Sequence, residues 1–127
     1  MTRALRLIWL AALAAVIVGS VLPAQSAAIS LIDRAGINDK VEHFTAYAVL
    51  AALPSLDRFR CRCLRATIAS LFLLGALLEL VQLFSPGRTC DWHDLLANSC
   101  GILVGVVLVR ISRLVSRPHF SAAPPAN

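Results

Sequence analysis

Charged residues are scarce in this chain: Asp, Glu, Lys and Arg make up 15% of its 127 residues, whereas 58% are hydrophobic. Such a balance lies well beyond that of soluble proteins and indicates an integral membrane protein without room for a separate soluble domain. The sequence also contains no internal repeat, phosphate-binding loop, nucleophile motif or metal-ligand set. We therefore predict neither a metal nor a cofactor.

Four apolar segments are the candidates for crossing a hydrocarbon core of roughly 30 Å. They run approximately from Leu5 to Leu22, from Val41 to Leu56, from Ala66 to Phe84 and from Leu95 to Val109. The second and fourth are short, and polar residues at their outer ends would continue each helix into the headgroup zone. Run length and composition favour helix over strand. We predict an all-α, single-domain membrane bundle of four transmembrane helices over residues 1–115, followed by a disordered tail at residues 116–127.

Basic residues set the predicted orientation, because short cytoplasmic loops carry an excess of Lys and Arg. Nine of the twelve precede the first segment, separate the second from the third, or follow the fourth: Arg3, Arg6, Arg58, Arg60, Arg62, Arg65, Arg110, Arg113 and Arg117. Both termini should therefore be cytoplasmic, in a multi-pass protein of the inner membrane. The net charge of +5 is a topology signal, and no nucleic-acid partner is predicted from it.

The first segment could instead be a cleaved signal peptide. Its basic start, its apolar run and the small residues around Ala24–Ala27 fit the export pattern. The apolar run is longer than is typical for that pattern, so we favour a retained helix. Cleavage would change the number of helices and leave the remaining topology unchanged.

The four cysteines do not form a disulfide framework in this topology. Cys61 and Cys63 would lie in the basic connection from Asp57 to Arg65, which faces the reducing cytosol, and their spacing is wrong for a zinc site. Unpaired thiols are therefore favoured. Cys100 is interpreted as a small helix-packing residue, and its place inside the last segment argues against pairing with Cys90.

Glu79 and Gln82 lie one helical turn apart inside the most hydrophobic stretch of the chain. An ionisable side chain at a helix centre costs roughly 3 kcal/mol of insertion free energy, so it points to function. A buried carboxylate must be protonated or paired, and Arg88 and Lys40 are the nearest candidates by height. Six of the seven acidic residues belong to the outer side of the predicted topology: Asp33, Asp39, Glu42, Glu79, Asp91 and Asp94.

Helical spacing places polar groups on one face of each of three helices. The three sets are Lys40, His43 and Tyr47; Gly75, Glu79 and Gln82; and Asp94, Asn98, Gly101 and Gly105. Facing lipid would leave the polar groups unsatisfied, so we expect the three faces to meet at the outer end of the bundle.

Structural alternatives exist for several of these residues. Asp39 with Glu42, and Asp91 with Asp94, have capping-box spacing; this explanation is favoured for Glu42 and Asp91 and stays open for Asp39 and Asp94. The pair Gly101-x-x-x-Gly105 most simply forms a helix-packing notch. Tyr47 and His93 could anchor at the membrane interface, as Trp92 could.

Taken in order, the sequence contains Asp39-Lys40-x-x-His43-Phe44-x-x-Tyr47, Glu79-x-x-Gln82, Arg88, and Asp94-x-x-x-Asn98-x-x-Gly101-x-x-x-Gly105. From Asn38 to about Val107 it resembles the VanZ-like family, small bacterial membrane proteins named for an accessory protein of teicoplanin resistance. The resemblance implies about four membrane spans, without a settled activity, and marks nine positions: Asp39, Lys40, His43, Tyr47, Glu79, Gln82, Arg88, Asp94 and Asn98. His93 receives little weight, because Cys90–His93 departs from the small polar residues of relatives.

Two functions are consistent with these residues. The first is binding of, or chemistry on, an anionic lipid or phosphate-bearing envelope-precursor headgroup, with Glu79 and His43 exchanging protons. Lys40 and Arg88 would hold the phosphate, and Asp94, Asn98 and Gln82 would orient these groups. The alternative is a non-catalytic membrane scaffold or accessory factor whose polar network only fixes helix packing. A transporter ranks third, because the polar groups do not reach the cytoplasmic half.

Overall fold

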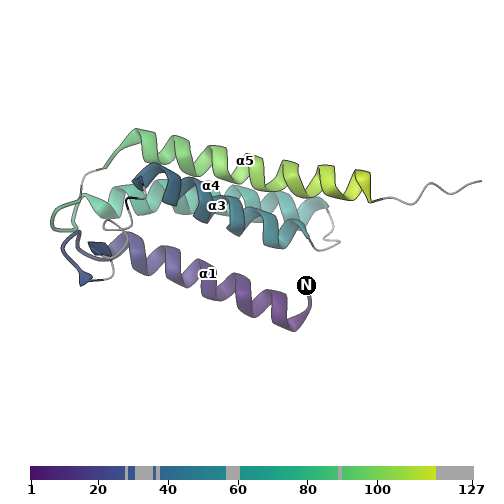
Figure 1. The fold of residues 1–127 in the computed structure, drawn as a ribbon, viewed down its shortest axis with the longest axis horizontal. Helices are drawn as coiled ribbons and strands as arrows, with labels where there is room; N and C mark the ends of the chain where they lie inside the picture. Colours follow the sequence, from purple (N-terminus) through teal and green to yellow (C-terminus); the bar gives the residue numbers. More distant parts are fainter. Residues whose placement is uncertain (28, 31–35, 37, 57–60, 89, 117–127) are drawn as a thin grey trace, which may run out of the picture.

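The regular secondary structure in the described part of the chain is all helical. The computed structural model describes residues 1–27, 29–30, 36, 38–56, 61–88 and 90–116, and these contain no strand. Its main helices are α1 (Arg3–Val21), α3 (Asp39–Ser55), α4 (Cys61–Gln82) and α5 (Trp92–Val115) (Figure 1). The all-α prediction is confirmed. The predicted disordered tail lies outside the described residues except for Ser116.

Three helices are long and apolar enough to cross a membrane: α1, residues 63–82 of α4, and α5. The fourth, α3, has 17 residues and begins with Asp39, Lys40 and Glu42 within its first turn, so it is not among them. At a rise of 1.5 Å per residue it extends about 25 Å, somewhat less than a hydrocarbon core. A fourth membrane crossing therefore stays a prediction, as does the orientation of the termini.

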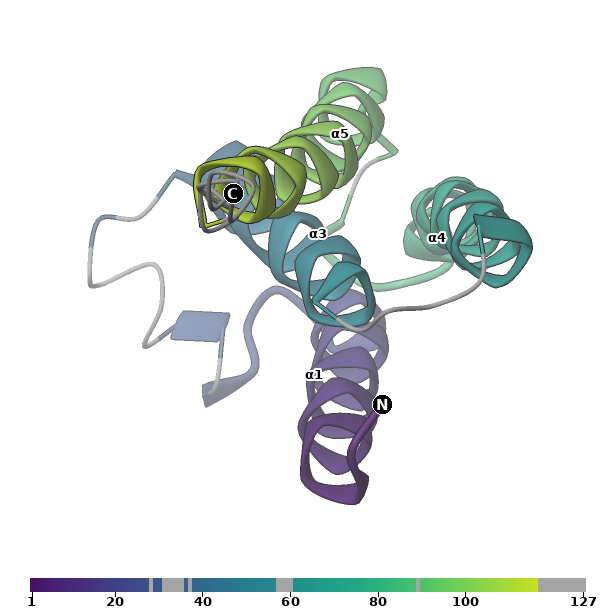
Figure 2. The ribbon, with the colours of Figure 1, turned by 90° about the vertical axis from the view of Figure 1, so that its right-hand side faces the viewer.

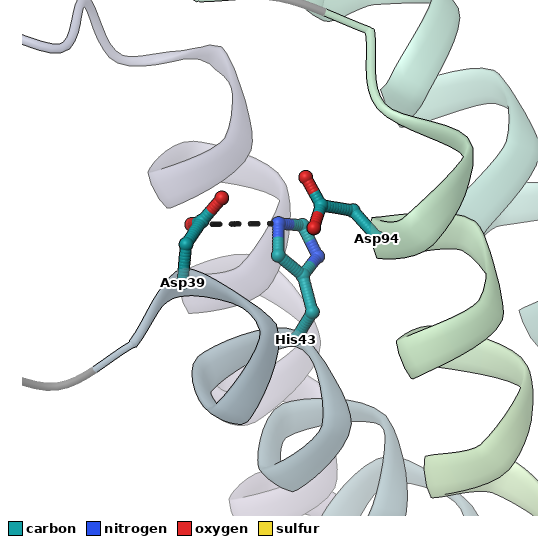
Figure 3. A group of neighbouring side chains, drawn as sticks. All are labelled: Asp39, His43 and Asp94. Carbon is teal, nitrogen blue, oxygen red and sulfur yellow. Dashed lines mark ion pairs between the residues drawn. The ribbon is translucent and has the colours of Figure 1, made fainter.

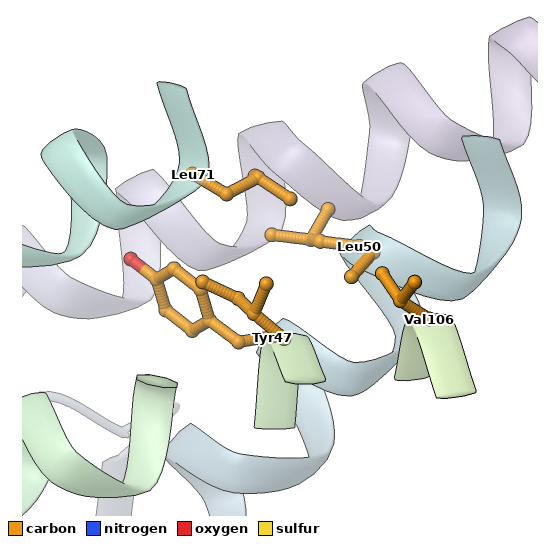
Figure 4. Packing of buried hydrophobic residues seen from close by; sticks show 6 residues of the cluster. Tyr47, Leu50, Leu71 and Val106 are labelled. Carbon is orange, nitrogen blue, oxygen red and sulfur yellow. The ribbon is translucent and has the colours of Figure 1, made fainter. Parts of the chain in front are cut away.

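The bundle is built around α3, which lies between α1 and α5, with α4 to one side (Figure 2). Side chains from α3, α4 and α5 form the buried core around Tyr47, Leu50, Leu71 and Val106 (Figure 4). The indole Nε1 of Trp9 on α1 donates a hydrogen bond to the Leu50 carbonyl, at 2.9 Å. This bond ties the first helix to the centre of the bundle.

Two glycines of α5 allow α3 to approach closely. A Cβ atom at Gly101 would overlap the backbone carbonyl of Phe44, and one at Gly105 would overlap that of Ala48. Any larger residue would therefore force the two backbones apart. The pair of glycines places the polar ends of α3 and α5 side by side.

Two expectations about helix ends and faces are wrong, and one open alternative is excluded. Cys61 and Cys63 lie in α4, which begins at Cys61 rather than Ala66, because the basic residues before the apolar run are compatible with helix. Cys100 is exposed, since it lies about 100° around α5 from Gly101, which faces α3. The N-cap of α3 is Asn38, whose side chain accepts from the Lys40 amide, so Asp39 does not cap that helix.

Candidate functional site

The polar residues gather at one end of the bundle, where α1 and α4 end and α3 and α5 begin; we call this end the mouth (Figure 1). The first turn of α1 and the last turn of α5 lie at the opposite end (Figure 1). Glu79, Gln82, Asp94 and Asn98 are all buried although they are polar. The structure thus brings together the polar faces of α3, α4 and α5, which the sequence predicted to meet.

Lys40 joins α3 to α5 at the mouth. Its Nζ lies 3.0 Å from Oδ2 of Asp91 and 3.1 Å from Oδ1 of Asp94. These hydrogen bonds, first to Asp91 and then to Asp94, raise the pKa of Lys40 above its ordinary value. The sequence indicated only a capping role for Asp91. The structure shows that Asp91 caps α5 through the His93 amide and also binds Lys40.

Asp91 is a carboxylate of the mouth with close contacts to both His93 and Lys40. The backbone amide of His93 donates to its Oδ1 at 2.9 Å, and the His93 ring lies 2.6 Å from the same atom. The His93 amide first, then Lys40, lowers the pKa of Asp91 below its usual range. His93 itself is exposed, and its ring packs 3.8 Å from that of Trp92. Among the described residues, His93 contacts the polar site through Asp91.

His43 occupies the centre of the polar group. Its Nδ1 lies 3.0 Å from Oδ1 of Asn98. Because an amide oxygen can only accept, Nδ1 is the donor in this contact. Nε2 lies 3.8 Å from Oδ1 of Asp39, one turn earlier on α3 (Figure 3).

Glu79 approaches His43 from α4. Its Oε1 lies 4.0 Å from Nδ1 of His43, and neither carboxylate oxygen has a hydrogen-bond partner among the described residues. The expected pairing with Lys40 or Arg88 is wrong. Lys40 binds Asp91 and Asp94, while Arg88 lies near Asp39. Position along the helix axis correctly predicted that both cations lie near the level of Glu79. It could not predict which side chains they contact around the bundle.

Arg88 connects the mouth to α1. Its Nη2 donates to the carbonyl of Gly19 at 3.3 Å, and its Nη1 lies 3.9 Å from Oδ1 of Asp39. The Nε atom is buried and has no partner among the described residues. One donor of the guanidinium is thus unused within the described residues.

Tyr47 lies in the interior rather than at the interface, so the alternative of an interfacial anchor is wrong. Its hydroxyl is buried without a hydrogen-bond partner in the described part of the chain. A Cβ atom at Gly75 would lie 3.4 Å from this hydroxyl and 3.3 Å from Nδ2 of Asn98. Gly75 therefore makes room for both side chains one turn below Glu79.

Two adjoining cavities open at the mouth, and together we call them the cleft. One measures about 240 Å³ and the other about 380 Å³, and both are lined by Ile29, Asp39, Glu42, Gln82 and Arg88. The smaller cavity continues between α1 and α3 along apolar residues, Ala15, Val16 and Ala46, and reaches His43 and Tyr47. The larger one adds Lys40, Asp91 and Asp94. Glu42, interpreted from sequence as a helix-start residue, thus also borders the cleft.

This arrangement can accept an amphiphilic molecule, since a polar opening lies above an apolar wall. Unpartnered donors on Arg88 and Tyr47 can bind oxygen atoms. His43 and Glu79 are close enough for proton exchange after a small movement. The carboxylates of Asp39 and Asp94 face the same imidazole and offer oxygen ligands to a cation.

Comparisons with known proteins agree with the motifs quoted above. No curated protein and no solved structure showed significant similarity to the chain. The family model described as VanZ/LLP1 matches residues 6–113, which run from the first turn of α1 to the last turn of α5. The resemblance inferred from the polar motifs is confirmed, and the chain belongs to the VanZ/LLP1 family.

Proposed function

We propose that the cleft binds the phosphate-bearing headgroup of a membrane lipid or lipid-linked envelope precursor at the extracytoplasmic face of the inner membrane. The observation that carries this proposal is the combination of an apolar wall along α1 and α3 with buried donors that have no partner in the described chain. Soluble ligands have no need of the apolar wall, whereas an acyl chain can lie along it while its headgroup reaches the mouth.

Arg88 is the residue best placed to hold a phosphate group. It lines both cavities, its Nε is unpartnered, and its contact with Asp39 is long at 3.9 Å. A guanidinium can bind two phosphate oxygens at once. Lys40 also borders the larger cavity, but a phosphate would compete there with two carboxylates. In this proposal Lys40 mainly holds α3 to α5.

The remaining residues of the site orient the headgroup and exchange protons. Gln82 lines both cavities and Tyr47 the smaller one, so both can donate to headgroup oxygens. Asn98 holds the His43 ring by its Nδ1, and Glu79 lies on the same side of that ring. If the protein also catalyses a reaction, His43 and Glu79 are the acid–base pair.

Native mass spectrometry of the detergent-extracted chain tests the binding proposal. We expect a co-purifying phospholipid or precursor that is lost in Arg88→Ala and retained in Arg110→Ala, a matched change at an exposed position of α5. Equal lipid occupancy in both variants would contradict the proposal. A parallel teicoplanin-susceptibility assay with the same variants tests the link to glycopeptide resistance that the family's naming suggests.

A non-catalytic scaffold is the second candidate, and the Lys40 bridge between α3 and α5 favours it. In that case the only role of the polar groups is to fix how the helices pack against one another. Replacing Glu79 and Arg88 together by Leu should then preserve both the folded bundle and any phenotype. Loss of the phenotype while the protein remains folded in the membrane would exclude the scaffold.

A further inference from the structure

We propose that Asp39, His43 and Asp94 bind one divalent transition-metal cation at the mouth. This role goes beyond headgroup binding and does not depend on it. One potential ligand atom from each of the three residues lies within 4.8 Å of the others. The three side chains come from the first turns of α3 and α5 and converge on one point (Figure 3).

The hydrogen bond of His43 leaves the correct ring nitrogen available. Nδ1 donates to the Asn98 side chain, so Nε2 is the ring nitrogen left for a metal, and it faces Asp39 at 3.8 Å. Histidines that bind metals usually donate their other ring N–H to an oxygen atom in this way, which fixes the tautomer and the ring orientation. Asn98 is therefore a positioning residue for the site.

Glu79 gives a second, independent indication of a cation. Its side chain is only 4% exposed, both oxygens lack a hydrogen-bond partner among the described residues, and Oε1 points to His43 at 4.0 Å. A buried carboxyl group is either protonated or stabilised by positive charge close by, and a cation at the mouth would allow the ionised form. A metal on Nε2 supplies that charge from the opposite edge of the same imidazole.

Lys40 does not block the site. Its Nζ binds Oδ1 of Asp94, which leaves the second carboxylate oxygen for a metal. The Lys40 side chain is 44% exposed and also bound to Asp91, so it can move toward Asp91 when a cation enters. Ligand atoms about 2.1 Å from one metal are no more than about 4.2 Å apart. Asp39, which is 51% exposed, can move by the small amount required.

The donor set indicates which cations fit. Two carboxylates and one imidazole suit Mn²⁺ or Zn²⁺, whereas Mg²⁺ and Ca²⁺ prefer oxygen ligands alone. Exposed thiols at Cys63, Cys90 and Cys100 would also attract Zn²⁺. Mn²⁺ is therefore the better probe, since its preference for oxygen and nitrogen separates the proposed site from the cysteines.

The experiment uses the full chain in detergent micelles, stripped with EDTA and titrated with Mn²⁺, with free Mn²⁺ measured by electron paramagnetic resonance. We expect one Mn²⁺ per chain, and a Kd raised at least roughly tenfold in Asp39→Asn and in Asp94→Asn. Asp57→Asn is the matched control. It removes the same charge from the segment that follows the C-terminal end of α3, outside the ligand group and the cleft, and should change Kd by less than about threefold.

Two results would overturn the site. One is the absence of saturable Mn²⁺ binding, and the other is an equal loss of affinity in Asp57→Asn, which would indicate diffuse attraction by acidic residues. Circular dichroism checks that each variant keeps its helices. If buried Asp94→Asn unfolds, the half-exposed Asp39→Asn decides the question alone. Lipid that still co-purifies with a chain that binds no Mn²⁺ would refute the metal and leave the headgroup proposal standing.

Discussion

The imidazole of His43 and the amide of Asn98 form a buried hydrogen bond, 3.0 Å long, between α3 and α5. These residues are 55 positions apart in sequence, and the bond is possible because Gly101 and Gly105 let the two helices approach closely. It therefore connects the packing of the bundle to the chemistry of the mouth.

Asn98→Ala should destabilise the bundle. The substitution leaves the Nδ1–H of His43 without its acceptor in a largely buried position, which costs about 1–3 kcal/mol. Ser99→Ala is the control, because the Ser99 hydroxyl bonds only the Leu95 carbonyl of its own helix. Unfolding in a graded detergent–denaturant series measures both variants. Equal stability of the two would show that the His43–Asn98 bond contributes nothing.

Gly101→Ala should separate α5 from α3. Its new methyl group would overlap the Phe44 carbonyl, and relief of such a backbone contact costs about 1–3 kcal/mol. Gly19→Ala on α1 meets nothing within 4 Å and should be neutral or stabilise by up to about 1 kcal/mol. Thermal melting in detergent compares the two changes. A stable Gly101→Ala variant would contradict the close packing described here.

Trp9→Phe should weaken the attachment of α1. The ring volume is largely kept, but the Nε1–H donor to the Leu50 carbonyl is lost, at a cost of about 1 kcal/mol. Trp92→Phe, at a mostly exposed position, should have little effect. Intact-mass analysis of the membrane-extracted chain tests the premise, because cleavage of the first segment as a signal peptide would remove Trp9 altogether.

Because Asp91 is stabilised in its charged form, we expect the free energy of unfolding to fall in acid. Its pKa is lowered in the folded chain, so its contribution is complete above the ordinary value of about 3.8 and is lost as the pH falls through the folded pKa. Melting temperatures measured between pH 7 and pH 3 should therefore fall less steeply in Asp91→Asn than in the unmodified chain. Parallel curves for the two proteins would refute this role.

Because Lys40 is stabilised in its charged form, we expect the free energy of unfolding to fall in alkali. Its pKa is raised in the folded chain, so its contribution is complete below the ordinary value of about 10.5 and declines as the pH rises through the folded pKa. Lys40→Met should lower stability at neutral pH and flatten the decline above pH 10. A decline as steep in Lys40→Met as in the unmodified chain would assign it to other groups.

Much of the fold and part of the site were predictable from local sequence. Apolar run length indicated the helices, and spacings of three, four and seven residues placed Lys40, His43 and Tyr47 on one helix face. Helix ends were less predictable, because α4 and α5 extend beyond their apolar runs through residues compatible with helix. The dual role of Asp91 was missed, since capping spacing alone explained it.

The sequence by itself determined that this is an all-helical VanZ-family chain with helices apolar enough to cross a membrane and a polar end, because hydropathy and helical period are local properties. Only the tertiary structure decided which polar side chains contact one another. Lys40 binds Asp91 and Asp94. His43 lies beside Asn98 and Glu79. Those pairings depend on how each helix is rotated about its axis. That rotation is set by contacts between distant segments, such as Gly101 against Phe44, which no local pattern encodes.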